Sequence, residues 1–500
     1  MKKILIIILV FLTVTACKKL DPLNANLKDF TVVSGEAIYN GATRALLNQM
    51  FTPNVNNNNT MLFVQYFAET TYPDESRYDM VTRTIPAAHM NTLYRNVLMN
   101  YKDAKRALTA APLAGIDQKQ RDNELAIIEV MSVFTWSNLV ETFGNMPYSD
   151  ALDFTKPTPK YDDGLTIYKD LIVRLNAAIL KLNPAYAGMG KGFDNVFGGG
   201  VAGTAQWIKF ANTLKLRMGI MLSDISTEAA TTAKTAIESA APNVFNVPIT
   251  SPTTGDKFAM AYLSASPNTT PMYTELILSG RFDYVLTSVY VNPMNTLNDP
   301  RRAGYLWTQI GGAYVGGAQG MPNSYGSFTH VNNALLSPTR EVVLMDYTEA
   351  EFLLAEAVER GYSVGGTAAT HYNNAITSSI LYWGGSASDA TTYLAQPAVA
   401  YATATGTWRQ KIGTQTWFAY YFRGMTAWTN WRRLDYPRLI ASPKHVQEVN
   451  GIPERYIYPV SEQTLNGDNY KVAAAAIGGD KAEIRLFWDK GPENYDSSFH

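Results

Sequence analysis

Trp428-Thr-Asn-Trp-Arg-Arg-Leu-Asp-Tyr-Pro437 places two adjacent arginines among large aromatic side chains near the C-terminal end of this 500-residue chain. The segment closes a longer stretch, residues 415–436, whose apolar residues have the spacing of an amphipathic helix. A charge among aromatic side chains needs a partner when it is buried. We therefore predict that Arg432 and Arg433 form structural ion pairs and do not contact a ligand.

Helical spacing recurs along most of the chain. Apolar residues lie three and four positions apart in residues 94–101, 136–143 and 207–221, and further helices are predicted over 166–182, 347–360 and 368–382. Residues 351–376 indicate two helices joined by a glycine-containing turn, which resembles one tetratricopeptide helix pair. The fold class is therefore predicted to be mainly α.

Two long stretches lack this spacing. Residues 51–89 contain four consecutive asparagines, and residues 242–341 are rich in Gly, Asn, Pro, Ser and Tyr. Loops of this length inside a compact domain are usually functional or disordered. We predict that they form the ligand-facing part of the molecule, laid over a helical base.

The N-terminus predicts an exported, lipid-anchored protein. Two lysines precede an apolar run, residues 4–14, which is too short to span a bilayer but has the length of a signal-peptide core. Val14-Thr15-Ala16-Cys17 resembles a bacterial lipobox, in which the cysteine is acylated and becomes the first residue; the alternative is an ordinary secretory signal. We predict a signal peptide at 1–16, lipidation at Cys17, a tether over 17–33 and a single domain over 34–500.

Composition excludes several classes of protein. Lys plus Arg number 42 and Asp plus Glu 43, so no basic excess favours nucleic acid. Cys17 is the only cysteine, which excludes an internal disulfide and a Cys-x-x-Cys metal site. The five histidines show no H-x-x-x-H spacing. No cofactor is predicted, although calcium bound by loop carboxylates and carbonyls stays open.

Two short motifs resemble enzyme signatures but lack the secondary structure that those signatures require. Gly361-Tyr-Ser-Val-Gly365 fits G-x-S-x-G, but a helix precedes it where a nucleophile elbow requires a strand. Gly198, Gly200 and Gly203 fit G-x-G-x-x-G, but no apolar strand precedes them. We interpret Gly361 as a helix C-terminal residue and Thr204 as a helix N-cap.

Aromatic and polar residues of the two irregular stretches are the candidate ligand contacts. An aromatic ring can support the apolar face of a sugar while Asp, Asn and Arg bind its hydroxyls. The candidates are Tyr72, Asp74, Arg77 and Tyr78 in the first stretch and Trp307, Tyr314 and Tyr325 in the second. Trp307 is the strongest of them, because the glycines at 304, 311 and 312 should leave space around it. Each ring could instead be a packing residue.

Four longer segments are more specific than any short motif. They are Trp136-Ser-Asn-Leu-Val-Glu-Thr-Phe-Gly-Asn-Met-Pro-Tyr148, residues 207–217, residues 415–437 and residues 452–466. Together with the lipobox, they resemble the SusD/RagB family of outer-membrane nutrient-binding lipoproteins of Bacteroidota over essentially the whole mature chain. Thr426 departs from the family, because many members have glutamate there. We interpret Arg455 and Glu462, within the last segment, as structural charges like Arg432 and Arg433.

The resemblance implies a SusD-like fold of tetratricopeptide-like helix pairs with irregular insertions that carry the ligand site. It also implies a non-catalytic protein on the exterior of the outer membrane, which captures an oligosaccharide and delivers it to a SusC-like TonB-dependent transporter. A peptide-binding member of the same scaffold is the alternative. A surface glycoside hydrolase is less favoured, because acidic residues such as Asp74 are better interpreted as acceptors for sugar hydroxyls than as a catalytic pair.

Overall fold

A computed structural model describes residues 33–302, 306–442, 444–446 and 451–491. Cys17, the signal peptide and the tether up to residue 32 lie outside the described residues, so those predictions stay open. None of the described helices is long and apolar enough to cross a membrane.

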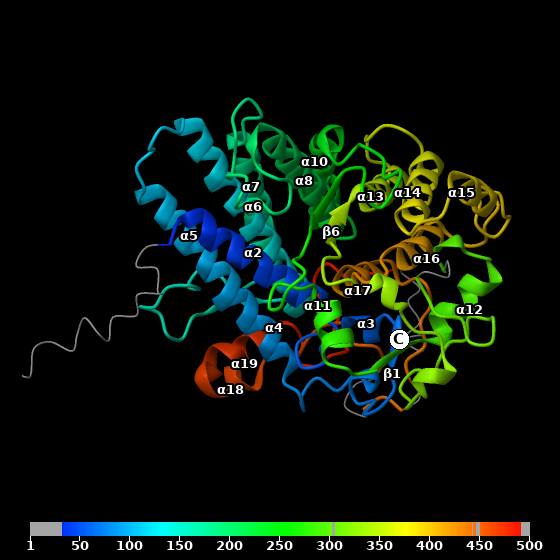
Figure 1. Cartoon of the computed structure of the whole chain (residues 1–500). Helices are drawn as coiled ribbons and strands as arrows, with labels where there is room; N and C mark the ends of the chain where they lie inside the picture. Colours follow the sequence, from blue (N-terminus) through cyan, green and yellow to red (C-terminus); the bar gives the residue numbers. More distant parts are fainter. Residues whose placement is uncertain (1–32, 303–305, 443, 447–450, 492–500) are drawn as a thin grey trace, which may run out of the picture.

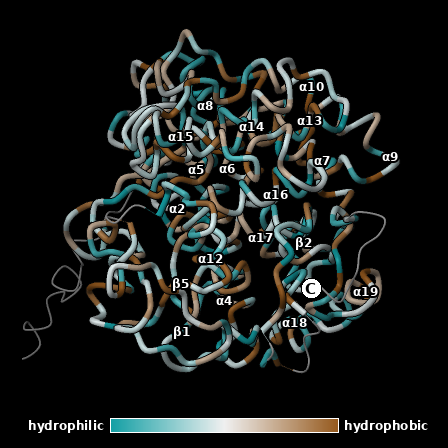
Figure 2. The backbone as a smooth tube through the Cα atoms, turned by 90° about the vertical axis from the view of Figure 1, so that its right-hand side faces the viewer, coloured by the Kyte–Doolittle hydropathy of each residue, from teal (hydrophilic) through white to brown (hydrophobic). Residues whose placement is uncertain are grey.

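Helices form the scaffold, as the sequence predicts. The scaffold helices pack against one another in pairs that lie close in the chain, notably α6 on α7, α8 on α10, α13 on α14 and α16 on α17. Figure 1 shows them side by side across the upper part of the molecule, and Figure 2 shows the same layer after a quarter turn. Their bounds are α2 (Gly35–Phe51), α5 (Met99–Ala110), α6 (Gln118–Phe143), α7 (Gly164–Lys181), α8 (Gly200–Met221), α10 (Lys234–Ala240), α13 (Tyr347–Glu359), α14 (Ala368–Tyr382), α16 (Trp408–Ala419) and α17 (Gly424–Leu434).

Most of the shorter elements lie in the lower part and at the edges, whereas β6 lies near α13 in the middle of the view (Figure 1). The short helices include α3 (Thr60–Phe63), α4 (Ile85–Asn91), α9 (Ser226–Glu228), α11 (Pro271–Tyr273), α12 (Ser288–Thr296), α15 (Ala387–Leu394), α18 (Val460–Leu465) and α19 (Gly467–Ala476). The strands are β1 (Phe67–Glu69), β2 (Met146–Pro147), β3 (Tyr161–Asp162), β4 (Lys257–Met260), β5 (Tyr284–Leu286) and β6 (Val342–Asp346). They pair antiparallel as β1 with β5, β2 with β3 and β4 with β6.

Helix ends follow local sequence signals. The side chains of Asp163, Asp346 and Thr367 each accept a backbone N–H in the first turn of α7, α13 and α14, which satisfies a donor that the helix leaves unpaired. Gly361 follows α13 with φ of 81°, as expected for a C-terminal glycine. The N-cap prediction for Thr204 is wrong, because α8 already begins at Gly200.

The predicted helix over residues 415–436 is interrupted. α16 ends at Ala419 and α17 begins at Gly424, with Phe422 between them at φ of 70°. The turn directs the buried guanidinium of Arg423 to the Leu344 carbonyl oxygen and to the carboxylates of Asp346 and Glu349. The helix therefore breaks at a point where Arg423 forms ion pairs with residues distant in the sequence, and helical periodicity could not indicate this break.

The structure confirms ion pairs for two of the four charged residues. Arg433 pairs with Glu356, and Arg455 Nη1 lies 2.7 Å from Asp480 Oδ1. Arg432 is also structural, but it donates to the backbone carbonyls of Glu141 and Glu454, and its guanidinium carbon lies 3.7 Å from the centroid of the Trp428 ring. Glu462 differs from the prediction, since it accepts a hydrogen bond from the Tyr161 hydroxyl at 2.7 Å.

The α13–α14 pair contains a pH-sensitive contact. His371 Nδ1 lies 2.8 Å from Glu351 Oε2, and His371 Nε2 lies 3.1 Å from the Gly365 carbonyl oxygen. Burial alone lowers the pKa of His371, but these two acceptors outweigh it and raise the pKa above its usual value. A raised pKa stabilises the fold below the unfolded-state value of about 6.5, and this contribution is lost as the pH rises through the folded-state pKa.

His371→Gln should therefore lower stability more at about pH 5.5 than at about pH 9. Urea denaturation of the variant and the wild-type protein at both pH values measures this difference. An equal loss at the two pH values would contradict the assigned contact.

Candidate functional site

The two irregular stretches meet along one seam. β1 from the first pairs with β5 from the second, with Phe67 opposite Leu286 and Glu69 opposite Tyr284. Beyond the strands, Thr70 donates its N–H to the Asp283 carbonyl at 2.9 Å and its hydroxyl to the Phe282 carbonyl at 2.6 Å. The parts of the two stretches around β1 and β5 therefore contribute to one surface, below the helical layer in Figure 1.

Aromatic rings gather beside this seam. Tyr72 is 71% exposed and Phe282 is 62% exposed; Tyr72 lies two residues after Thr70, and the Phe282 carbonyl accepts the Thr70 hydroxyl. The half-buried Tyr325 ring lies 4.7 Å from Phe282 and stacks on His330 at 3.8 Å, measured between ring centroids. We call Tyr72, Phe282, Tyr325 and His330 the aromatic platform.

Tyr72 also adopts an uncommon backbone conformation. Its φ is 52°, in the left-handed region that a bulky side chain rarely occupies. Such strained residues cluster at binding sites, where the surrounding structure holds a side chain in a required position. The backbone thus presents the Tyr72 ring to solvent.

Polar groups border the platform. Asp74 has a side chain that is 55% exposed and lies 3.9 Å from Arg77, whose Nε also donates to the Gly320 carbonyl at 2.9 Å. Arg281 and Asp283 form an ion pair of 2.8 Å on either side of Phe282. These groups offer both donors and acceptors to the hydroxyls of a bound sugar.

Two nearby carboxyl groups are hidden. Glu69 is 4% and Glu75 is 1% exposed. Burial raises the pKa of Glu69 well above its ordinary value. Two hydrogen bonds from Ser76 lower this pKa in part, and the nearby charge of Glu75 raises it further. A glycosidase needs its carboxyl groups at the scissile bond, and this pair is covered.

Two predicted contacts lie in the core instead. Trp307 is 1% exposed and packs against Tyr290, Tyr314 and Tyr421, with ring centroids 5.5, 5.8 and 6.0 Å away. Tyr78 is fully buried, and its hydroxyl accepts from the Ser442 N–H at 3.2 Å.

The expectation of free space around Trp307 is therefore wrong. Gly311 and Gly312 do border open space, at the turn between Ile310 and Ala313. Trp307, however, forms a bridge with Val331 and its ring faces inward. Gly311 and Gly312 therefore leave space at the turn, but not around the Trp307 ring.

Tyr314 lines a separate surface groove of about 390 Å³, which we call the Tyr314 groove. The Arg302 guanidinium lies 5.4 Å from the centroid of the Tyr314 ring, and Asp389 and Gln396 lie on the groove wall. The predicted residues thus separate into the platform side (Tyr72, Asp74, Arg77, Tyr325), the groove (Tyr314) and the core (Tyr78, Trp307).

Phe282 and His330 are the platform residues that the sequence analysis missed. Both lie inside the predicted irregular stretch. Phe282 lies between Arg281 and Asp283. An aromatic residue flanked by two charged residues indicates an exposed position, so the sequence does contain a signal for Phe282. The stacking of His330 on Tyr325 depends on a turn that no periodicity reveals.

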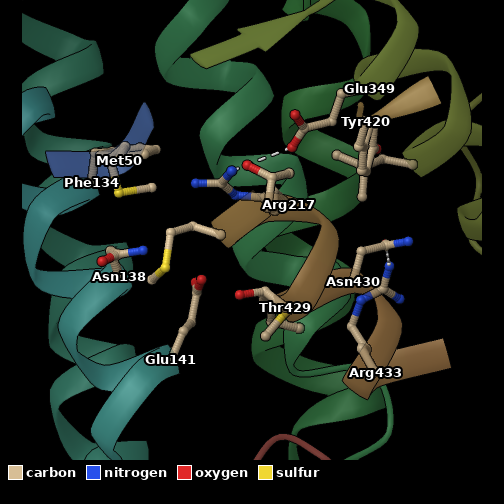
Figure 3. A pocket seen from close by; sticks show the side chains of 14 residues that line it. Met50, Phe134, Asn138, Glu141, Arg217, Glu349, Tyr420, Thr429, Asn430 and Arg433 are labelled. Atoms are coloured by element: carbon tan, nitrogen blue, oxygen red, sulfur yellow. Dashed lines mark hydrogen bonds and ion pairs between the residues drawn. The ribbon is translucent and has the colours of Figure 1, made fainter. Parts of the chain in front are cut away.

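A small internal cavity lies between the helices of the scaffold (Figure 3). Its volume is about 30 Å³, enough for one or two water molecules but not for a sugar. Glu141, Arg217 and Thr426 line it, and Arg217 Nη1 donates to Glu349 at 3.3 Å. Burial raises the pKa of Glu141, whose carboxylate accepts from the Tyr168 hydroxyl at 2.7 Å. This cavity belongs to the scaffold.

No group of three or more His, Cys, Asp or Glu side chains suited to a metal occurs in the part of the chain that the structure describes. Calcium binding stays untested.

Comparisons with known proteins show which family shares this architecture. A family model described as "Starch-binding associating with outer membrane" matches residues 27–459. Among solved structures, a chitin-binding SusD homolog from Flavobacterium johnsoniae is 24% identical with a TM-score of 0.75, covering 92% of this chain and 99% of that one. A SusD homolog from Bacteroides uniformis is 25% identical with a TM-score of 0.69, covering 90% and 99%.

A search of curated proteins found no match. The match to the family model nevertheless extends over most of the chain and includes the helical scaffold and both irregular stretches. The solved structures share the same mainly α fold along nearly their whole length. The chain therefore belongs to the SusD-like family, as the four sequence segments predicted.

Proposed function

We propose that this protein is a non-catalytic surface lipoprotein that binds an oligosaccharide on the aromatic platform. The observation that carries the proposal is the exposure of Tyr72 and Phe282 beside one hydrogen-bonded seam. Exposed aromatic rings with donors and acceptors around them match the two faces of a sugar, one apolar and one hydroxylated.

The comparisons support a glycan as the ligand class. The family model carries a starch-binding description, and one structurally similar protein is named as chitin-binding. The Tyr314 groove provides a second polar, aromatic surface, formed partly by the second irregular stretch and partly by residues 384–396. A long glycan could contact both surfaces, with the platform providing the main stacking contacts.

Anchoring and delivery complete the proposal. Acylation of Cys17 would hold the protein at the outer membrane, facing the exterior. The bound oligosaccharide would then pass to a SusC-like TonB-dependent transporter in the same membrane. Family membership supports both steps.

Peptide binding and hydrolysis are the alternatives. A peptide can also stack its aromatic side chains on exposed rings, so the platform alone does not separate peptide from glycan. Against hydrolysis, Glu69 and Glu75 are both covered. Asp74, two residues after Tyr72, is exposed, but hydrolysis of a glycosidic bond requires a pair of carboxyl groups.

Affinity gels that contain starch, glycol chitin or pectin test the ligand class, using protein that begins after Cys17. We expect at least one polysaccharide to retard migration, with no new reducing ends after prolonged incubation. Binding of a peptide library without retardation by any glycan would favour the peptide alternative. Release of reducing sugar by the purified protein would overturn the non-catalytic assignment.

A further inference from the structure

A second pocket lies among the scaffold helices α5, α6 and α7, on the side of the molecule away from β1 in Figure 1. The segment that follows β2 closes one side of it. Its volume is about 380 Å³, which is enough for a monosaccharide-sized ligand. None of its lining residues belongs to the platform or to the Tyr314 groove. We call it the α5–α7 pocket.

One wall of the α5–α7 pocket is aromatic and held in place. The rings of Trp136 and Tyr148 meet edge to face, with centroids 5.0 Å apart. The Tyr148 hydroxyl accepts a hydrogen bond from Arg174 Nη1 at 2.7 Å and donates to Asp170. Because both ring positions are fixed by contacts within the protein, the wall needs no rearrangement to receive a ligand.

The rest of the lining contains more cations than anions. Lys102, Lys105 and Arg174 face one carboxylate, that of Glu129. Both oxygens of Glu129 are engaged, by Lys105 Nζ at 2.5 Å and by Arg174 Nε at 2.6 Å. Burial would raise the pKa of Glu129, but these two cations outweigh it and lower the pKa, which keeps the carboxylate charged.

The lining of the pocket also has more hydrogen-bond donors than acceptors available for a ligand. A lysine ammonium has three donors, and Lys102 uses one of them on the Leu152 carbonyl oxygen. The carboxylates just outside the lining are engaged elsewhere, Asp170 by Tyr148 and Asp153 by the N–H and hydroxyl of Thr155. Spare donors therefore outnumber spare acceptors inside the pocket, which favours a ligand rich in acceptors.

We propose that the α5–α7 pocket binds a small carboxylate-bearing sugar, with its ring against the half-buried Tyr148, which the buried Trp136 supports from behind, and its carboxylate between Lys102 and Arg174. The aromatic wall matches the apolar face of a pyranose ring. The two cations match a carboxylate, which Arg174 can meet with its Nη2 group while Nε and Nη1 keep their present partners. This site is independent of the platform and of the function proposed for it.

Calorimetric titration with glucuronate tests the site, with glucose as a matched ligand that lacks the carboxylate and sulfate as an anion that lacks the ring. We expect glucuronate to bind at least tenfold more tightly than either. Lys102→Gln should weaken glucuronate binding at least fivefold. Lys119→Gln is the matched control, because Lys119 is an exposed lysine on α6 that does not line the pocket.

The binding should also weaken as salt is raised, because the exposed Lys102 contributes by charge. Equal affinity for glucose would overturn the role of the cations, and equal affinity for sulfate would overturn the role of the aromatic wall. Glucuronate binding that Lys102→Gln leaves unchanged, or that a Tyr72→Ala variant abolishes, would place the ligand elsewhere and overturn the proposal.

Discussion

Trp307→Ala should lower the free energy of unfolding by about 3–5 kcal/mol, the range for removing a large buried aromatic side chain. Trp307 is 1% exposed and touches the rings of Tyr290, Tyr314 and Tyr421. Truncation would leave a cavity among these rings, which cannot collapse fully onto it. Urea denaturation at 25 °C, with the slope of the transition compared between variants, measures the loss.

Tyr72→Ala is the matched control for this prediction. Its ring is 71% exposed, so its removal should change the free energy of unfolding by less than about 0.5 kcal/mol. A Trp307→Ala variant as stable as Tyr72→Ala would mean that Trp307 is not a core residue. That result would instead support Trp307 as an accessible ligand contact.

Glu356→Gln should also destabilise the protein strongly, by about 3 kcal/mol or more, because it leaves the buried Arg433 without its carboxylate partner, whereas Arg360 keeps its ion pair with Asp224. Glu356 is 1% exposed, pairs with Arg433 and accepts from Arg360 Nε at 2.8 Å. Burial raises the pKa of Glu356, but the two arginines outweigh it and lower the pKa below its usual value. The carboxylate is therefore charged at neutral pH and joins α13 to α17.

Glu359→Gln provides the comparison for Glu356→Gln on the same helix. Glu359 is exposed and accepts a hydrogen bond from Tyr401 at 2.6 Å, so its replacement should cost less than about 0.5 kcal/mol. Urea midpoints of the two variants, measured at neutral pH, decide the matter. Similar midpoints for both would contradict the assigned buried ion pair.

The sequence predicted the scaffold well because helix signals are local. The helix predicted over residues 368–382 has those bounds in the structure, and the helix predicted over 347–360 differs by one residue. Caps such as Thr367 lie within a turn of the residues they satisfy. The break between α16 and α17 was missed because its stabilising partners, Asp346 and Glu349, lie more than 70 residues away from Arg423.

The ligand site was predictable only as a region. The composition of the two irregular stretches located it, and Tyr72, Asp74, Arg77 and Tyr325 do lie on or beside the platform side of the molecule. Whether a given ring faces solvent depends on long-range pairing, such as that of Trp307 with Val331 or Thr70 with Phe282. Hydrophobic periodicity reports local secondary structure and does not identify these distant partners.

The central claim is that exposed rings at the seam, and not the buried Trp307, hold the ligand. Its most direct test is calorimetric titration of the double variant Tyr72→Ala/Phe282→Ala with an oligosaccharide from the polysaccharide that the wild-type protein retains best. Phe154→Ala is the control, because Phe154 is 88% exposed and does not belong to the platform. The account predicts that the double variant loses about 2–3 kcal/mol of binding free energy, roughly 30- to 150-fold in Kd, with Phe154→Ala unchanged; an unaltered Kd in the double variant would contradict it.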